Sequence, residues 1–318
     1  MGTVLVTGGA GFIGKYIARS LADAGEQVVV TYRRYFQAPQ LFSDIMESKV
    51  KAARCDILDL PELLRVIRDH DVDSIVHAAN TSNYEAPIYT CLQTNVLGTI
   101  NVMEAAAFGS LEKVTYISSG GVQGSLEGFP GGLESESIPI ASPAVVVIPP
   151  SKKVGEVLSL YYGATFGFSV AIVRPGLIYG PYGEAQIGNL KVLGGILEGV
   201  VAGKPVDLPD TSKEERFRLV YVRDVAAATS LVHRAPNNHH TVYCSDEKEP
   251  TSWREITEII KEFVPGATIT FGRSDLPAGE LRMLPEELNI TSEFGFKPKY
   301  GLKEGLRELI EWYQNGRP

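Results

Sequence analysis

The sequence predicts an α/β fold, with a doubly wound parallel sheet followed by a smaller C-terminal unit. Three observations predict it. A glycine-rich turn directly follows a short apolar run at 3–7 and opens an amphipathic stretch. Apolar runs of strand length then alternate with amphipathic stretches of helix length as far as position 176. A chain of 318 residues is also long enough to bury a large core.

The first unit carries the glycine-rich turn. The apolar run TVLVT is followed at once by GGAGFIG, then by helical spacing at 15–25 and a second strand pattern at 27–32. At such a junction Gly8 and Gly11 let a pyrophosphate approach the backbone, and Gly14 lets the helix pack on the strand. The N–H groups at the start of the helix attract the same anion, so the turn predicts a dinucleotide site.

The later elements continue the alternation. The sequence predicts further strands at 49–56, 72–80, 112–119 and 168–176. It predicts helices at 60–70, at 86–107, after Ser151, and in the C-terminal part at 190–203, 251–264 and 302–316. The last two have amphipathic spacing, and Ser252 with Glu255 forms a capping pattern. The alternation implies a parallel sheet with helices on both faces.

Composition excludes several classes of function. The net charge of −8 argues against a polyanion-binding surface, so we expect no nucleic-acid partner. No apolar run approaches the length of a bilayer and no signal-peptide pattern is present, so we expect a protein without a membrane partner.

The cysteines and histidines indicate the cellular compartment and whether a metal site is expected. The three cysteines are widely spaced and odd in number, which fits a reducing cytoplasm better than a disulfide framework. No cysteine pair has metal-ligand spacing, and the pair His239–His240 lies in a polar loop where we expect it to be solvated. We therefore expect a cytoplasmic protein with no metal.

The end of the second strand bears on the choice of cofactor. An acidic residue there would bind the ribose 2′-hydroxyl of NAD, but the chain has Tyr32 followed by Arg33 and Arg34. Guanidinium groups suit a 2′-phosphate, which favours NADP, with NAD less favoured. The alternative is that the two arginines form a solvated loop. Asp56 and Ile57, after the third strand, are placed to flank an adenine.

Taken together, the motifs resemble the extended short-chain dehydrogenase/reductase family, in its NAD(P)-dependent epimerase/dehydratase group. The matching segments occur in the family's order: TGGAGFIG (7–14), CDILD (55–59), VHAAN (76–80), TNVLGTINVMEAA (94–106), VTYISSGGVQG (114–124), SKKVGE (151–156), VRPGLIYGP (173–181), VYVRDVA (220–226) and GFKPKYGLKEGLRELIEWY (295–313). The resemblance implies a Rossmann domain and a smaller C-terminal α/β substrate domain. We expect the Rossmann domain at 1–175, with 219–245 returning to it, and the substrate domain at 176–218 and 246–318.

The resemblance also implies roles for single residues. Ser119 matches the family's catalytic Ser/Thr, and Asn95 matches the asparagine of the NVxGT segment. Lys152 matches the lysine that holds the nicotinamide ribose and lowers a neighbouring tyrosine's pKa. With the residues above, the expected cofactor site comprises Gly8, Gly11, Phe12, Ile13, Gly14, Arg33, Arg34, Asp56, Ile57, Ala78, Ala79, Lys152 and Pro175.

The chain departs from the family at its acid/base. The family's catalytic tyrosine falls on Ile148, and no tyrosine lies between Tyr116 and Tyr161. General acid–base help is typically worth about 10²–10⁴-fold in rate, so its loss should cripple ordinary carbonyl reduction. Replacement acids are Ser119 with a water, or the side chains of Tyr84, Tyr179 and Glu184. Of these, Tyr179 joins Ser119, Lys152 and Asn95 in the expected catalytic set.

Three functional hypotheses remain. The first is an NAD(P)-dependent oxidoreductase or epimerase-like enzyme acting on a small hydroxyl or carbonyl substrate by an atypical acid/base. The second is a lyase or dehydratase on the same fold. The third is a non-catalytic NADP(H)-binding sensor or an inactive subunit of a hetero-oligomer, in which Lys152 only holds the ribose and Ser119 only bonds backbone.

The C-terminal part bears on substrate and assembly. Arg216, Arg218 and Arg223 could grip a diphosphate, but clustered arginines are more often a solvated face, here paired with Glu214 and Glu215. A nucleotide-sugar substrate is therefore not favoured by the sequence. The helices at 86–107 and after Ser151 pair two subunits in the family, so the resemblance implies a homodimer, or a hetero-oligomer with an active relative.

Overall fold

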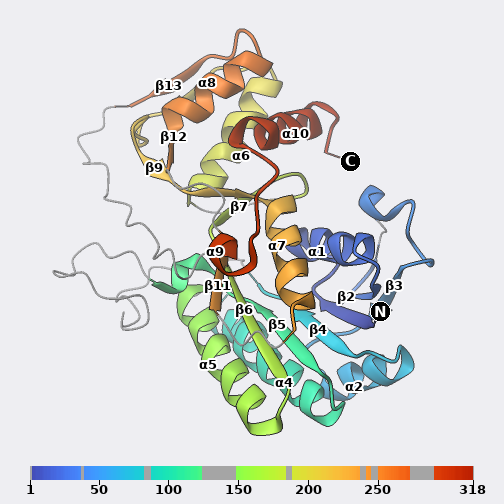
Figure 1. Cartoon of the computed structure of the whole chain (residues 1–318). Coiled ribbons are helices and arrows are strands. Elements are labelled where there is room, and N and C mark those ends of the chain that lie inside the picture. Colours follow the sequence, from blue (N-terminus) through green and yellow to red (C-terminus); the bar gives the residue numbers. More distant parts are fainter. Residues whose placement is uncertain are drawn as a thin grey trace, which may run out of the picture.

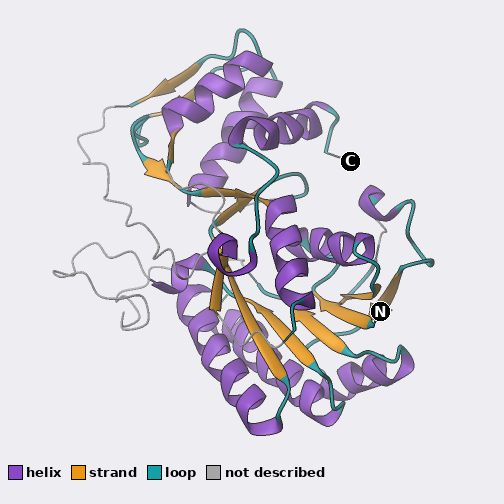
Figure 2. Ribbon diagram, in the orientation of Figure 1, coloured by secondary structure: helices purple, strands orange, loops and turns teal. Residues whose placement is uncertain are grey.

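Figure 1 shows the computed structural model of the chain, which describes residues 2–36, 39–81, 87–123, 148–183, 188–236, 241–244, 250–272 and 290–317. The lower part in this view is a sheet between two layers of helices. The upper part is a smaller unit of helices and short strands (Figure 2). The predicted α/β fold class is confirmed.

Within the described residues, the sheet has seven parallel strands. They are β1 (Thr3–Thr7), β2 (Gln27–Tyr32), β3 (Val50–Arg54), β4 (Ser74–His77), β5 (Lys113–Ile117), β6 (Ser169–Pro175) and β11 (Thr241–Cys244). Their spatial order is β11-β6-β5-β4-β1-β2-β3, and every pairing is parallel. The order reverses between β1 and β4. Open α/β sheets bind ligands at the carboxyl ends of the strands beside such a reversal, which places the candidate site.

The helices of the lower part follow the predicted alternation. They are α1 (Phe12–Asp23), η1 (Gln40–Phe42), α2 (Leu60–Asp69), α3 (Ile88–Leu92), α4 (Gly98–Phe108), η3 (Gly120–Gln123), α5 (Ile148–Phe166) and α7 (Val222–Arg234). The helix expected at 86–107 is interrupted by the π-helical turn η2 (Gln93–Leu97), which separates α3 from α4. Helix α5 begins at Ile148 and holds Pro149 and Pro150 in its first turn, where proline is tolerated.

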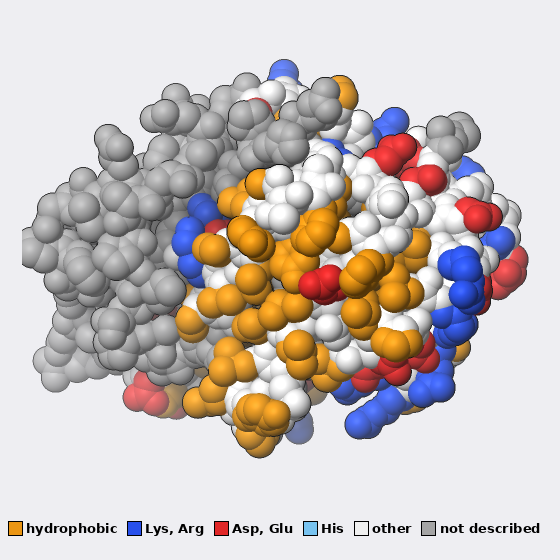
Figure 3. Space-filling view, turned by 90° about the horizontal axis from the view of Figure 1, so that it is seen from below, with side chains coloured by type: hydrophobic (Ala, Val, Ile, Leu, Met, Phe, Trp, Pro, Cys, Tyr) orange, Lys and Arg blue, Asp and Glu red, His pale blue; other side chains and the backbone are white. Residues whose placement is uncertain are grey.

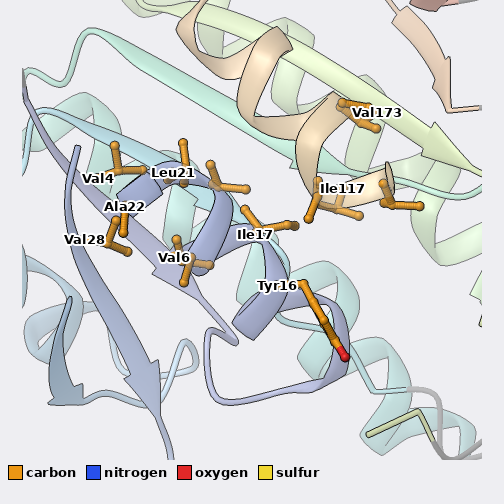
Figure 4. Packing of buried hydrophobic residues seen from close by; sticks show 14 of the residues in the cluster. Val4, Val6, Tyr16, Ile17, Leu21, Ala22, Val28, Ile117 and Val173 are labelled. Carbon is orange, nitrogen blue, oxygen red and sulfur yellow. The ribbon is translucent and has the colours of Figure 1, made fainter. Parts of the chain in front are cut away.

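Two hydrophobic cores cover the two faces of the sheet. On one face, Ile17 and Leu21 of α1 pack against Val4, Val6 and Val28, and α7 completes the layer (Figure 4). On the other face, side chains of α2 and α4 pack against β1, β4 and β5. Strand β5 is buried along its whole length, as expected of a central strand covered on both faces, and it includes the buried polar residues Lys113 and Thr115.

The upper unit has its own core. Its elements are β7 (Leu177–Tyr179), α6 (Gly188–Val201), β8 (Val206–Leu208), β9 (Arg216–Phe217), β10 (Leu219–Tyr221), β12 (Thr251–Ser252), α8 (Trp253–Phe263), β13 (Ile269–Phe271) and α10 (Leu302–Gln314). Side chains of α6, α8 and α10 surround the fully buried Trp253. Helix α8 starts at the expected capping box, because Ser252 Oγ accepts from Glu255 N at 3.2 Å and Glu255 accepts from Ser252 N at 2.6 Å.

One short helix packs against the sheet, although its position in the sequence lies within the expected substrate domain. Helix α9 (Ile290–Phe294) lies within the range 246–318 assigned to the substrate domain. Ile290 is nevertheless fully buried in the sheet-side core, and α9 contacts α7 and β11. The chain therefore crosses from the upper unit back to the sheet before it ends in α10.

Candidate active site

The glycine turn between β1 and α1 is shaped by close backbone contacts. Gly8 has a φ of +69°, which side chains rarely adopt. A Cβ at Gly8 would lie 2.7 Å from Ala79 Cα, and a Cβ at Gly14 would lie 2.2 Å from the Gly8 carbonyl oxygen. Glycine is required at both positions, and the contact brings Ala79, which follows β4, against the turn.

The start of α1 is suited to an anion. Its N-cap is Gly11, no side chain caps the helix, and its first turn contains no acidic residue. The exposed N–H groups of a helix start and its dipole attract phosphate, and Phe12 and Ile13 are the first residues of this helix. The turn therefore fits the pyrophosphate of a dinucleotide. The loop after β7 reaches this point too, because a Cβ at Gly183 would meet the Phe12 ring at 2.6 Å.

The residues expected at the adenosine end lie on adjacent strand ends. Cys55 N donates to Tyr32 O at 2.9 Å, which holds the ends of β2 and β3 together. Arg33 and Arg34 follow β2 and are exposed. Asp56 follows β3, where its carboxylate accepts from Leu58 N at 3.0 Å.

The neighbouring Ile57 is buried, and a Cβ at Gly98 of α4 would meet its Cδ1 at 2.5 Å. Ile57 is therefore packed as a fixed wall between the adenosine end and α4. Two exposed guanidinium groups follow β2, and the carboxylates of Asp56 and Glu62 lie close to the end of β3, where Glu62 accepts from Asp56 N at 2.7 Å.

Lys152 lies buried at the carboxyl end of β5. Its side chain, in the first turns of α5, is 5% exposed, and Nζ donates to Ile117 O at 2.7 Å. Nζ also lies 5.0 Å from the centroid of the Tyr116 ring. Burial lowers the pKa of Lys152 from its usual 10.5 to about 7, and the Glu156 carboxylate opposes this shift.

Asn95 connects three segments around the candidate site. It is buried in the π-helical turn, where Oδ1 accepts from Thr81 N at 2.9 Å and Nδ2 donates to Ser151 Oγ at 3.2 Å. Ser151 Oγ in turn donates to Ile148 O at 2.9 Å. Asn95 therefore fixes the start of α5 against the segment after β4, which is a positioning role.

Ser119 and Pro175 lie at the carboxyl ends of adjacent strands of the sheet. Ser119 follows β5 and is partly exposed, and Ser118 N donates to Val173 O at 2.7 Å. A Cβ at Gly120 would lie 3.2 Å from Pro175 O. The ends of β5 and β6 therefore form one surface that holds Ser119. The Lys152 amine is hydrogen-bonded to Ile117 O, two residues before Ser119.

A buried ion pair lies beneath this surface and was not predicted. Arg174 donates to both carboxylate oxygens of Glu156, at 2.6 and 2.7 Å, and both side chains are at most 4% exposed. Ser118 Oγ donates to the same carboxylate at 2.6 Å. A bidentate pair with an extra hydrogen bond ties α5 to β5 and β6. The order of SKKVGE and VRPG along the chain gave no signal that these residues meet.

His77 was likewise missed by the sequence interpretation. It ends β4 fully buried, with Nδ1 2.7 Å from Thr7 Oγ1 and Nε2 3.0 Å from Thr99 Oγ1. Thr99 gives its own hydrogen to Asn95 O at 2.7 Å, so Nε2 is the protonated nitrogen and donates to Thr99. Burial lowers the pKa of His77 to about 3, so the ring is a neutral crosslink.

The structure does not bring Tyr179 to this surface. Its side chain is 4% exposed within the upper core, and its hydroxyl donates to Leu302 O at 3.4 Å, at the start of α10. A Cβ at Gly305 would lie 2.2 Å from the Tyr179 hydroxyl. This packing against α10 is a structural position, which corrects the placement of Tyr179 in the catalytic set. The other replacement acids Tyr84 and Glu184, like His239–His240, lie outside the described residues.

Arg216 and Arg223 have different partners. Arg216 donates to Pro250 O at 2.8 Å, and Arg223 pairs with Glu308 at 3.1 Å. Glu214 pairs with Arg254 and not with Arg216 or Arg223, so the expected pairing of Glu214 was wrong. No group of three potential metal ligands occurs in the part of the chain that the structure describes. Within the same residues, no helix has the length and apolar character to cross a bilayer.

The strand order and the glycine turn are those of the Rossmann class of α/β proteins. Comparison with known families makes this specific: the NAD dependent epimerase/dehydratase family matches residues 4–244. The chain belongs to this family and is of the extended short-chain dehydrogenase/reductase type, as its motifs predicted.

Individual relatives agree over the full length. A dTDP-glucose 4,6-dehydratase from Streptomyces niveus is 28% identical, covering 99% of this chain and 93% of its own. The structure of a Thermus thermophilus UDP-glucose 4-epimerase in complex with NAD superposes with a TM-score of 0.78 at 26% identity, covering 98% and 99% of the two chains. That of a Thermotoga maritima UDP-glucose 4-epimerase with UDP-glucose has a TM-score of 0.80 at 20% identity, covering 99% of both chains.

Proposed function

We propose that this chain is a nicotinamide-dinucleotide-dependent enzyme that oxidises or reduces a small hydroxyl or carbonyl substrate with an atypical acid/base. The observation that carries the proposal is Lys152, buried beside Ser119 at the carboxyl end of β5, on the same sheet edge as the glycine turn. When bound, the nicotinamide supplies or accepts the hydride.

The chain's own residues divide the remaining tasks. The backbone of Gly8, Gly11 and the first turn of α1 would hold the pyrophosphate. Ser119 would donate to the substrate oxygen, since it is partly exposed at the strand end. Asn95 and the Glu156–Arg174 pair would keep the start of α5 and the end of β6 in register with that oxygen.

We propose NADP(H) as the preferred cofactor. Arg33 and Arg34 are exposed at the end of β2, where they could pair with a 2′-phosphate. The names of several similar structures specify NAD, so the test has to separate the two. Fluorescence titration of the protein with NADPH and with NADH should show NADPH binding at least about 10-fold more tightly, a gap of about 1.4 kcal/mol. Arg33→Ala with Arg34→Ala should abolish that gap, and equal affinities in the unaltered chain would contradict the preference.

The first substrates to test are sugars carried on a nucleoside diphosphate. The sequence does not favour them, but the names of relatives and similar structures specify dTDP-glucose and UDP-glucose enzymes. Incubation with each nucleotide sugar and NADP⁺ or NAD⁺, followed by absorbance at the reduced-nicotinamide band and by mass analysis, tests this class. An epimerase or dehydratase regenerates its cofactor, so the product has to be examined directly. An epimer has the mass of its substrate and is identified by chromatographic separation, whereas elimination changes the mass. A mass loss of one water would favour the lyase/dehydratase hypothesis over net oxidation.

The non-catalytic hypothesis makes a different prediction. A sensor or an inactive subunit would bind the dinucleotide and turn over none of these probes, with or without Lys152. Binding of neither dinucleotide would overturn the oxidoreductase proposal itself.

We also propose that two copies of the chain pair through the face of α3, α4 and α5. These helices and the turn η2 expose large apolar side chains, namely Ile88, Tyr89, Leu92, Leu97, Phe108, Val154, Val157, Leu160, Tyr161 and Phe166. Figure 3 views the molecule from the side on which α4 and α5 lie, and hydrophobic side chains spread over it. Extended exposed apolar patches are typical of protein interfaces. About a twofold axis the same surface of both subunits forms the interface, so these helices would face the same helices of the second copy.

A further inference from the structure

We propose that Lys152 is itself the general acid/base of this site, exchanging a proton directly with the substrate oxygen. This inference rests on the proposed oxidoreductase function and names the atypical acid/base that it requires. It gives Lys152 a role different from holding a ribose for a tyrosine, because the tyrosine position is Ile148.

The position of the amine is the first argument. Lys152 Nζ lies at the carboxyl edge of the sheet, where it donates one hydrogen to Ile117 O at 2.7 Å. A lysine side chain has four rotatable bonds and three donor hydrogens, so the amine can keep its place near β5 and still offer a hydrogen towards the surface around Ser119. The amine also lies near the aromatic face of Tyr116, which does not accept a proton.

The second argument concerns the neighbouring titratable groups. Each of them already has other partners or is kept in one protonation state by burial. On α5, Glu156 accepts from Arg174 of β6 and from Ser118, and Lys153 pairs with Glu156 at 3.3 Å. On β4, His77 bonds to two threonines and stays neutral.

On β5, burial raises the pKa of Tyr116, and its hydroxyl lies where a Cβ on Gly155 would come within 2.1 Å. Among the described residues of this part of the site, Lys152 is therefore the group that can gain and lose a proton near neutral pH. The burial that lowers its pKa supports this role, since catalytic lysines are commonly tuned by desolvation.

The proton balance is complete without another group. In the oxidising direction the substrate C–H bond breaks and its electron pair leaves as hydride for the nicotinamide of the proposed cofactor. The substrate O–H bond breaks, a C=O bond forms, and the neutral Lys152 amine takes the proton. In the reducing direction the Lys152 ammonium returns that proton to the oxygen. Oxidation therefore needs the neutral amine, and reduction needs the ammonium.

The same strand supplies a matched control. Lys113, at the opposite end of β5, is also buried and donates to Val232 O at 3.0 Å and Ala235 O at 2.6 Å. Burial lowers the pKa of Lys113 to about 8. Lys113 is a residue of β5, and Lys152 of α5 is hydrogen-bonded to Ile117 O at the other end of that strand. Both amines are buried, and of the two only that of Lys152 lies at the carboxyl edge.

The first test measures the amine directly. Carbon-13 labelling of the lysine ε-position and NMR titration of the whole protein, alone and saturated with NADP⁺, would follow the Lys152 signal. Lys152→Arg and Lys113→Arg assign the two shifted signals by their loss. We expect the Lys152 amine to titrate near 7 alone and below about 9 with NADP⁺ bound. Titration near the usual value of 10.5 in the bound state would overturn the proposal, whatever the substrate.

The second test uses turnover of dTDP-glucose or UDP-glucose, whichever the unaltered chain converts. Lys152→Arg keeps a cation that can hold ribose hydroxyls but cannot lose its proton near neutral pH. We expect NADP⁺ affinity to change by less than about 3-fold and turnover to fall by about 10²–10⁴-fold, while Lys113→Arg keeps turnover. Adding Ile148→Tyr to Lys152→Arg should restore part of the rate with a new pH profile.

The outcomes separate the two proposals. Full turnover by Lys152→Arg overturns the role of Lys152 and leaves the proposed function standing. Absence of turnover in the unaltered chain counts against the proposed function for these probes, while the NMR titration still decides whether the amine has an acid/base pKa.

Discussion

At the scale of single residues, two helical glycines make opposite predictions. Gly155 of α5 faces β5, and a Cβ there would lie 2.1 Å from the Tyr116 hydroxyl and 2.5 Å from its ring carbon Cζ. Gly195 of α6 has nothing within 4 Å of the same built atom. Because Tyr116 is fully buried in a dense core, it has little room to move.

We expect Gly155→Ala to lower the free energy of unfolding by about 1–3 kcal/mol through overpacking. We expect Gly195→Ala to raise it by about 0.5–1 kcal/mol, since alanine is the better helix former. Urea denaturation of both variants gives the comparison. Stabilisation by both changes would show that α5 does not pack on Tyr116 as described.

His77 gives a prediction on pH. Its folded pKa of about 3 lies below the usual 6.5, so the unfolded chain binds the extra proton between these values. The neutral ring's contribution to stability is therefore complete above pH 6.5 and is lost as the pH falls towards 3. One such histidine should account for about 1.4 kcal/mol of stability lost between pH 7.5 and pH 5.5.

His77→Asn removes this pH-dependent contribution to stability. The other buried histidine, His233, is present in both proteins. The variant should be less stable at pH 7.5, because the bonds to Thr7 and Thr99 are lost, but its stability should fall less steeply on acidification. Urea unfolding at the two pH values measures both effects. A difference between the proteins that is equal at both pH values would contradict a neutral, fully buried ring.

At the scale of elements, local signals predicted what depends on local sequence. The strand at 27–32 and the start of α8 at its capping box follow from residues next to one another. The π-helical turn at Asn95, the Glu156–Arg174 pair and the burial of Tyr179 depend on which elements meet in space. Glu156 and Arg174 are 18 residues apart and on different elements, so no periodicity joins them. The glycine turn and Lys152 lie at the same edge of the sheet, and each stands in a motif whose neighbours along the chain are local.

The capping box of α8 allows a test of an element. Ser252→Ala removes the oxygen that accepts from Glu255 N, so we expect a loss of about 1 kcal/mol in the free energy of unfolding. Glu255→Gln keeps a side-chain acceptor for Ser252 N and should cost less. Chemical denaturation of both variants decides the order. A larger loss for Glu255→Gln would indicate that the charge near the helix start matters more than the cap.

At the scale of the whole molecule, the cofactor helix and the C-terminal helix are joined by a set of aromatic and charged contacts. Tyr16 of α1 donates to Pro181 O at 3.3 Å, and Tyr182 packs on Trp312 of α10 with ring centroids 5.6 Å apart. Arg223 at the start of α7 pairs with Glu308 of α10. The upper unit is thus held over the carboxyl edge of the sheet from the α1 side, and the proposed subunit face lies on α3, α4 and α5 instead.

That separation makes the proposed pairing testable without touching the site. Val157 is 60% exposed on α5, and burying an aspartate against a second apolar surface is strongly unfavourable. Light scattering after size-exclusion chromatography should give twice the 34.5 kDa chain mass for the unaltered protein and the single mass for Val157→Asp. Arg68→Asp, on an exposed position of α2 outside this face, should leave the mass unchanged. A single-chain mass for the unaltered protein, or a double mass for Val157→Asp, would count against this interface. Dinucleotide binding by the Val157→Asp monomer would then show whether each subunit carries a complete cofactor site.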